Sequence, residues 1–297
     1  MLNDQDIQSI ITLLEDPDEE VQSSLFDWFH ARGEEAVFQL ESIGKNARER
    51  DRGGIAHMIE LLRARFNYDS LQKWVENPHD NLLRGLYLIQ KVISPDADYD
   101  RMDTQLTDMV SCVCVELSDD QTDMERVKVF NHLFFHRLGF KAVDPMFEQP
   151  QKTFIHLALS EREGSPIALG IIYLLVAFHS GVPIRGRVFK GGFLPAVIDR
   201  SGEVIFYVNV YRNGQLFDHT QLSSFVKDMN ANIPEDSFRE ATVTDLAKVY
   251  AETLYYSFTV KDGEASRKAA VDVRNVLGLF GSPDLLTIEI DEDEDEE

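Results

Sequence analysis

One apolar helix followed by strand-like runs constrains the fold of this chain most. Residues 164–181 read GSPIALGIIYLLVAFHSG. Ser165 is a favoured N-cap, Pro166 suits the first helical position, and Gly181 suits a helix end. The apolar residues between them recur at helical spacing, so we expect a buried helix. Its core-facing residues are expected to be Ile167, Ile171, Leu174, Leu175 and Phe178.

After this helix the pattern changes to strands. Residues 184–189, 193–198 and 204–211 are rich in β-branched and aromatic side chains, and 200–203 reads as a hairpin turn. Residues 216–217 suggest a further short strand. Pro195 has no N–H to donate to a ladder, so we expect its strand to lie at an edge or to be bulged there.

Helical patterns flank this segment on both sides, so the chain is expected to be an α+β protein. Before residue 140 the amphipathic stripes recur at helical spacing, and 242–280 returns to helices. The expected divisions are a HEAT-like helical region over residues 1–62, a core of central helix and small antiparallel sheet over 63–240, a C-terminal helical pair over 241–282, and a disordered acidic tail over 283–297.

The charge of the chain limits its partners. The formal net charge is -23, and residues 291–297 are all acidic. Such a field repels nucleic acid and anionic membrane surfaces, and it favours protein or peptide partners with basic segments. The first ten residues are polar and acidic, unlike a signal peptide, and the longest apolar run is too short to span a bilayer. We expect a cytoplasmic protein.

Four segments in series resemble the transglutaminase-like superfamily, and within it the bacterial SirB-type branch. They are VKVFNHLFFHRLGF at 127–140, QKTFIHLAL at 151–159, EGSPIALGIIYLLVAFHSGVPIRG at 163–186 and FYVNVYRNG at 206–214. The resemblance implies a helical N-terminal half, a central helix packed on an antiparallel sheet, and a tetratricopeptide-like helical end.

The superfamily's chemistry requires a cysteine at the start of the central helix, a histidine on a following strand, and an Asp or Asn that orients the histidine. Carried over by position, these residues fall on Pro166, Gly192 and Asn209. In the SirB-type branch proline commonly replaces the cysteine, whereas the histidine is commonly kept. The resemblance therefore implies a degenerate triad, which predicts a pseudoenzyme with no cofactor and no metal.

We therefore expect a protein-binding, scaffold or regulatory module. The residues expected to line the inherited groove are Asn131, His156, Ser165 and Tyr211. The alternative is an amide hydrolase with relocated catalytic residues, drawn from Ser165, His156 or His219. For Ser165 the helix-cap role is favoured over that of a nucleophile.

Two further patterns have a chemical and a structural interpretation. His132 and His136 have the i,i+4 spacing of a metal pair, with Asp144 and Glu148 as additional ligands within reach along the chain. Cys112 and Cys114 form a Cys-x-Cys pair, but two residues apart on a helix they point in different directions. We favour the structural interpretation for both pairs.

Overall fold

The computed structural model describes residues 4–14, 16–78, 81–143, 149–222 and 238–281, which form two compact units, 1–73 and 74–297. Each unit is described by itself. The predicted acidic tail lies outside the described residues. In the described part of the chain, no helix is long and apolar enough to cross a membrane.

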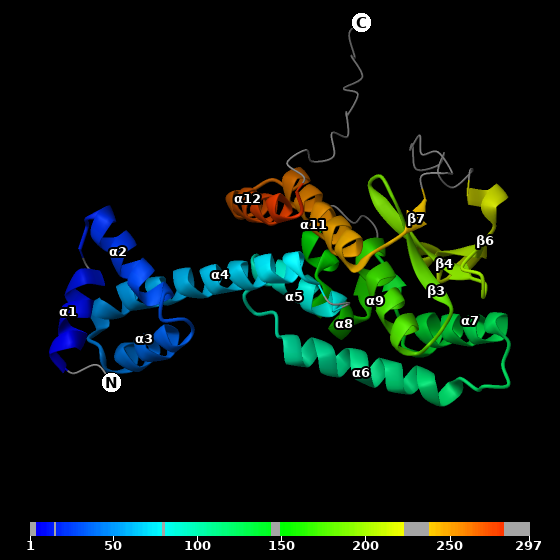
Figure 1. Ribbon diagram of the computed structural model, residues 1–297, viewed down its shortest axis with the longest axis horizontal. Helices are drawn as coiled ribbons and strands as arrows, with labels where there is room; N and C mark the ends of the chain where they lie inside the picture. Colours follow the sequence, from blue (N-terminus) through cyan, green and yellow to red (C-terminus); the bar gives the residue numbers. More distant parts are fainter. Residues whose placement is uncertain (1–3, 15, 79–80, 144–148, 223–237, 282–297) are drawn as a thin grey trace, which may run out of the picture. The chain divides into compact units, whose positions relative to one another are not determined.

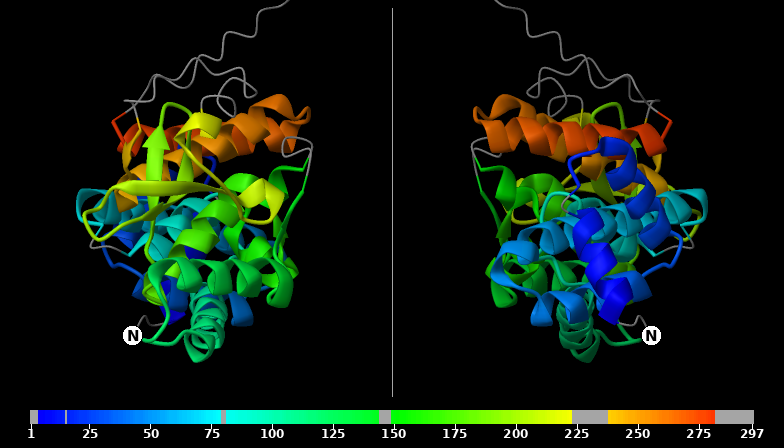
Figure 2. Two further views of the ribbon diagram at one scale, coloured as in Figure 1. Left: turned by 90° about the vertical axis from the view of Figure 1, so that its right-hand side faces the viewer. Right: turned by 90° about the vertical axis from the view of Figure 1, so that its left-hand side faces the viewer.

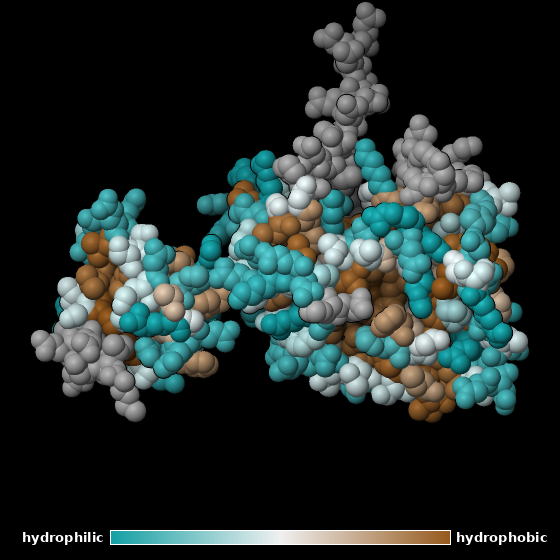
Figure 3. Space-filling model, in the orientation of Figure 1, coloured by the Kyte–Doolittle hydropathy of each residue, from teal (hydrophilic) through white to brown (hydrophobic). Residues whose placement is uncertain are grey.

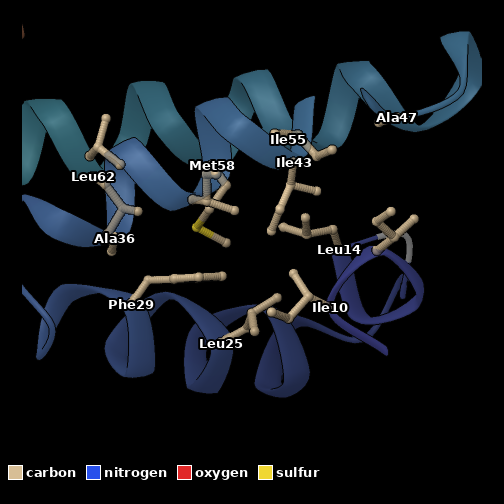
Figure 4. Close-up of a cluster of buried hydrophobic side chains, with 13 residues drawn as sticks. Ile10, Leu14, Leu25, Phe29, Ala36, Ile43, Ala47, Ile55, Met58 and Leu62 are labelled. Carbon is tan, nitrogen blue, oxygen red and sulfur yellow. The ribbon is translucent and has the colours of Figure 1, made fainter. Parts of the chain in front are cut away.

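The first unit is made of helices around one apolar core (Figure 1). Leu25 and Phe29 project from one helix toward Met58 and Leu62 of another, and Phe29 and Leu62 are fully buried (Figure 4). The second helix begins at an Asp18 cap, whose side chain accepts from the Glu20 N–H. The elements are α1 (Asp4–Leu14), α2 (Glu19–His30), α3 (Glu35–Asn46), the short turn η1 (Glu49–Asp51) and α4 (Arg52–Glu76).

The second unit begins with helices whose starts are set by capping side chains. Asn81 and Asp98 accept from backbone N–H groups three residues on, and Thr122 forms a capping box with Glu125. The elements are α5 (Leu82–Lys91), α6 (Tyr99–Glu116), α7 (Asp123–His132), the π-helical turn η2 (Leu133–Arg137), β1 (Lys141–Ala142), η3 (Pro150–Thr153), α8 (Ile155–Glu161) and β2 (Glu163–Gly164).

The central helix and the sheet follow. The five-stranded antiparallel sheet has the order β6-β5-β4-β3-β7. The elements are α9 (Pro166–His179), β3 (Ile184–Phe189), β4 (Gly192–Ile198), β5 (Val204–Asn209), η4 (Val210–Arg212), β6 (Gln215–Phe217), β7 (Arg239–Glu240), α11 (Val243–Val260) and α12 (Glu264–Leu279). The α+β prediction is confirmed.

The prediction for Pro195 as an edge residue was wrong. Its strand, β4, is the central strand of the sheet, and the register shift lies between Val197 and Ile198. Pro195 faces Gly186 of β3, whereas the recorded pairing of β4 with β5 begins at Ala196. The proline is tolerated because it lies just outside the second ladder.

Helices α9 and α11 cover one face of the sheet (Figures 1 and 2). Gly170 of α9 lies against the ring of Phe193, and Gly186 of β3 lies against Leu174 of α9 and Leu246 of α11. Figure 2 shows α11 and α12 side by side, in agreement with their contacts. The opposite face carries its own apolar cluster, which contains Leu194, Ala196, Tyr207, Phe217 and Leu222.

The apolar stripe predicted on α9 is buried over most of its length. Ile171, Leu174 and Leu175 are buried and Ile167 is half-buried. Phe178, at the C-terminal end of the helix, is 56% exposed, so its predicted burial was wrong. The spacing of apolar residues predicts which face of a helix is buried. It does not predict where along the helix the neighbouring layer of the protein ends.

Candidate functional site

The N-terminus of α9 contains Pro166, the residue predicted to stand at the cysteine position. Ser165 is fully buried, its Oγ accepts from the Ala168 N–H at 3.2 Å, and its own N–H donates to the Lys152 carbonyl at 2.8 Å. The predicted cap is confirmed. Pro166 follows as the first helical residue and is half-buried. It brings neither a thiol nor an N–H to this end of the helix.

Gly192, the predicted histidine position, is buried at the start of β4 opposite Phe189 of β3. A Cβ at Gly192 would stand 3.0 Å from Cζ of the Phe189 ring. That ring also packs on Phe238, with 4.8 Å between ring centroids. The neighbouring residue, Phe193, is the one that contacts α9, at Gly170, one turn beyond the first residue of the helix.

The third position, Asn209, ends β5 and pairs with Gln215 of β6. Its Oδ1 accepts from the Arg212 N–H at 3.1 Å and thereby caps η4. η4 contacts α9 and β1, and it contains the predicted groove residue Tyr211, which is 47% exposed. Phe193, which follows Gly192, and η4, which follows Asn209, thus both contact α9.

Asn131 of α7, another predicted groove residue, connects α7 to α9 and to the turn at Gly214. Its Oδ1 accepts from the hydroxyl of Tyr173, a fully buried side chain of α9. Its Nδ2 donates to the Gly214 carbonyl at 3.0 Å. Gly214 has φ of 78°, and a Cβ there would lie 2.6 Å from the Phe135 ring, so glycine is required on both counts.

His156 of α8, also predicted to line the groove, is half-buried and belongs to a polar network with two buried residues, Gln90 and Tyr250. Its Nδ1 hydrogen-bonds to Gln90 Nε2, and the Tyr250 hydroxyl donates to Gln90 Oε1 at 3.0 Å. Because an amide nitrogen donates, the proton of neutral His156 lies on Nε2, which is 3.6 Å from Asp96 Oδ2. Burial lowers the pKa of His156, and the Asp96 carboxylate opposes that effect.

The remaining candidates lie apart from these networks. His219 is exposed and meets the Tyr207 ring edge-on, while the Asp218 carboxylate accepts from Thr220 and Gln221. His132 and His136 are exposed, with ring centroids 5.2 Å apart. Within the described residues, no group of three metal-ligating side chains occurs; Asp144 and Glu148 lie outside them.

Cys112 and Cys114 are free thiols on α6. Cys112 is half-buried and Cys114 is exposed. Neither shares a recorded hydrogen bond or ion pair with a histidine of the described chain.

Sequence reasoning missed a pocket of about 310 Å³ at the opposite, C-terminal end of α9. Phe178 and Arg185 line it, together with residues of the turn between β4 and β5. Two signals were available in the sequence. Phe178 is the last residue of the apolar stripe, next to the end of the helix, and Arg185 is a charged residue within a predicted strand. Neither signal distinguishes a pocket from ordinary surface.

Comparison with known proteins decides the family. The model of the transglutaminase-like superfamily matches residues 100–250, about half of the chain. The chain belongs to the transglutaminase-like superfamily. Within the superfamily it groups with SirB-type proteins. It is 22% identical to protein SirB1 of Salmonella typhimurium over 206 residues, which cover 68% of this chain and 75% of that protein.

Two further relatives match over shorter spans. A UPF0162 protein of Vibrio cholerae is 25% identical over 139 residues, 47% of this chain and 51% of the relative. F-box only protein 21 of Mus musculus is 22% identical over 161 residues, 46% of this chain and 26% of the relative. The chain thus spans about half the length of the first curated relatives it matches. No solved structure matches.

Proposed function

We propose that this chain is a transglutaminase-like protein without catalytic activity that acts as a protein-binding or scaffold module. One observation carries the proposal. The cysteine position holds Pro166 as the first residue of α9, and the histidine position holds Gly192 beneath the Phe189 ring. Acyl transfer by a cysteine nucleophile needs a thiolate and a base within hydrogen-bonding reach of that thiolate.

The third position adds to this argument. An orienting residue acts by hydrogen-bonding to the imidazole of the catalytic histidine. The Oδ1 of Asn209 is instead used by the Arg212 N–H, as a cap of η4. Its role in the fold therefore does not depend on a histidine.

The alternative of an amide hydrolase with relocated residues is disfavoured by the same kind of evidence. Ser165 is fully buried with its Oγ engaged as a cap, and His156 is engaged with Gln90. Among the described residues, no recorded hydrogen bond joins Ser165 to a histidine. A serine nucleophile requires such a partner to remove its proton.

Exposed hydrophobic residues and the acidic sequence at 291–297 support a binding role. In the first unit, Trp28, Phe38 and Leu61 are large hydrophobic residues with substantial exposure, and Phe38 is 68% exposed. Figure 3 shows hydrophobic residues at the surface of both units. The acidic sequence at 291–297 favours a partner with basic segments through charge attraction. We propose that such a partner is a protein or peptide, met in the cytoplasm.

Activity measurements test the loss of catalysis. The full chain is incubated with glutamine-containing peptides and an amine, and with simple amide substrates, and product is followed by mass spectrometry. No turnover is expected from the wild type. Turnover that disappears in Ser165→Ala or His219→Ala would overturn the proposal in favour of a hydrolase.

Partner capture tests the binding role. The full chain is compared with a chain of equal length in which the seven acidic residues at 291–297 are replaced by Asn and Gln. A chain lacking 288–297 is added, and all are tested at two salt concentrations. Capture of basic partners by the full chain at low salt, weakened by salt and by either change, is expected. Capture of no partner by any form contradicts the proposal.

A further inference from the structure

The pocket at the C-terminal end of α9 is lined by residues of α7, α9, β3 and β4 of the second unit and of the turns next to them. Asp123 comes from the first turn of α7, Phe178 from α9, and Arg185 from β3. Arg126 of α7 reinforces the site, because its guanidinium donates to the Gly181 carbonyl at 3.2 Å. At about 310 Å³, the pocket has a volume near the lower end of the range of about 300–1,000 Å³ typical of ligand sites.

One wall of the pocket is apolar. Phe178 is 56% exposed, although it continues the buried stripe of α9, and Pro183 and Ile198 beside it are half-buried. An exposed aromatic ring next to aliphatic groups favours an apolar side chain as ligand. A single exposed apolar residue is common on protein surfaces. Phe178 differs because it lines a pocket next to the charged Arg185, so it is a candidate contact for a ligand.

The charged groups at the pocket differ in whether they already have a partner of opposite charge or a hydrogen-bond donor. The Asp199 carboxylate accepts from the Ser201 N–H, the Ser201 hydroxyl and the Glu203 N–H, and these bonds lower its pKa. Asp123 lies 3.9 Å from Arg200 Nε. Both carboxylates therefore have donors or a cation nearby.

Arg185 differs from its neighbours. Its guanidinium is 5.9 Å from the centre of the Phe178 ring, and its one recorded hydrogen bond goes to the Ile184 carbonyl. No ion pair recorded among the described residues includes Arg185. It is a half-buried cation in a chain of net charge -23, held over the aromatic wall, and no carboxylate of the described residues pairs with it. Its planar guanidinium suits a carboxylate, which accepts two parallel hydrogen bonds.

We propose that this pocket binds a partner peptide segment in which an aromatic or aliphatic side chain lies next to a carboxylate. The apolar side chain contacts Phe178, Pro183 and Ile198, and the carboxylate pairs with Arg185. The inference rests on the proposed binding function and gives that function a second site. This site is separate from the degenerate triad, and its ligand is different from the basic segments that the acidic sequence favours.

Fluorescence anisotropy with three labelled peptides tests the proposal on the full chain. Each is a heptapeptide with a central phenylalanine and glycines at the ends, and the two residues flanking the phenylalanine are aspartates, asparagines or lysines. The aspartate peptide is expected to bind at least tenfold more tightly than the asparagine peptide, since a charge-assisted pair contributes about 1.4 kcal/mol or more. The lysine peptide is the control for charge attraction: a chain in which the seven acidic residues at 291–297 are replaced by Asn and Gln is expected to bind it least, because in the full chain the acidic sequence also attracts it.

Variants then locate the site. Arg185→Gln is expected to abolish the preference for aspartate, Arg185→Lys to retain part of it, and Phe178→Ala to weaken binding of both the aspartate and the asparagine peptide. Arg274→Gln is the matched control, because Arg274 is an exposed arginine on α12 and does not line the pocket. It is expected to bind as the wild type does.

Equal affinity for the aspartate and asparagine peptides would overturn the proposal. The comparison of peptides uses the wild-type chain, so it decides even if Arg185→Gln does not fold. Aspartate preference that persists in a folded Arg185→Gln also overturns it. These results are independent of partner capture through the acidic sequence, so failure at this pocket leaves the proposed binding function to its own test.

Discussion

The ring of Phe189 occupies the space next to Gly192 that a side chain would need. The two residues are directly opposite each other in the β3–β4 ladder, so their side chains belong to the same face of the sheet. At a distance of 3.0 Å from Phe189 Cζ, even a methyl group at position 192 requires the ring to move. Because the ring is itself packed on Phe238, a histidine here would displace part of the apolar cluster behind the sheet.

This contact predicts the effect of adding one carbon atom. Gly192→Ala is expected to lower the free energy of unfolding by about 1–3 kcal/mol, as overpacked sites do. Urea denaturation measures the change. In the background of Phe189→Ala the same substitution is expected to cost much less, because the clashing ring is gone. Strict additivity of the two changes would show that the ring is not the obstacle.

A second glycine lies under an aromatic ring in the helical part of the second unit. A Cβ at Gly85 of α5 would stand 2.3 Å from Cζ2 of Trp74, whose Nε1 is tied to the Asn81 carbonyl at 3.0 Å. Gly85→Ala is therefore expected to destabilise the fold by about 3 kcal/mol or more. Thermal unfolding followed by circular dichroism checks this.

Gly278 of α12 provides the control for that experiment. It is exposed on a helix, and nothing lies within 4 Å of a Cβ built there. Gly278→Ala is expected to stabilise the protein by up to about 1 kcal/mol, because alanine is the better helix former. Equal effects of the two substitutions would contradict the packing assigned to Trp74.

The stability contributed by the N-terminus of α11 is expected to decrease at acid pH. The Asp245 carboxylate is hydrogen-bonded to Arg239 and completes a capping box with Thr242, and together these lower its pKa from 3.8 to about 2. Since the folded-state pKa is lowered, the stabilisation is present above pH 3.8 and is lost as the pH falls through about 2. Asp245→Asn is expected to remove this dependence, as measured by unfolding curves over the acid range.

Thr242→Ala separates the cap from the ion pair in the same place. It is expected to cost about 1 kcal/mol at neutral pH, the usual effect of losing an N-cap side chain. The acid dependence should remain in this variant, because Arg239 still contacts Asp245. Its disappearance would show that the cap, and not the arginine, holds the carboxylate ionised.

His156 predicts a second pH dependence, nearer neutrality. Burial lowers its pKa below 6.5, Asp96 and Glu161 act in the opposite direction, and Arg101 adds to the lowering. Because the unfolded chain then binds the proton more readily, stability is full above pH 6.5 and decreases as the pH falls below it. Urea denaturation between about pH 7 and about pH 5 measures this decrease.

The variant His156→Gln is expected to flatten that profile, whereas His219→Gln, at an exposed histidine, is expected to leave it unchanged. A profile that is as steep in His156→Gln as in the wild type would assign the dependence to another group.

Local signals in the sequence predicted the central helix and the sheet well. The bounds of β3 and the Ser165 cap agree with the prediction, because capping and alternation act between residues that are near in sequence. Pro195 failed as an edge signal because the extent of pairing with β5 is decided by residues beyond the strand itself. Phe178 failed because its burial depends on where the sheet ends.

The candidate site was less accessible to prediction for the same reason. The sequence predicts that Asn131 and His156 line the inherited groove, but it does not reveal their partners, which lie far away in the chain. Gln90 is 66 residues from His156, and Gly214 is 83 residues from Asn131. Whether such a side chain faces a ligand or another part of the protein depends on long-range packing, which a single sequence does not reveal.

The side-chain amide of Asn131 is used in both of its chemical senses, as acceptor from Tyr173 and as donor to the Gly214 carbonyl. Aspartate has almost the same shape but can only accept when it is ionised. Deamidation at this residue would thus turn an attraction into a repulsion between two oxygen atoms, within a protein otherwise almost unchanged. In a stored sample, deamidation of Asn131 would therefore weaken the contacts among α7, α9 and the turn at Gly214 as the sample ages.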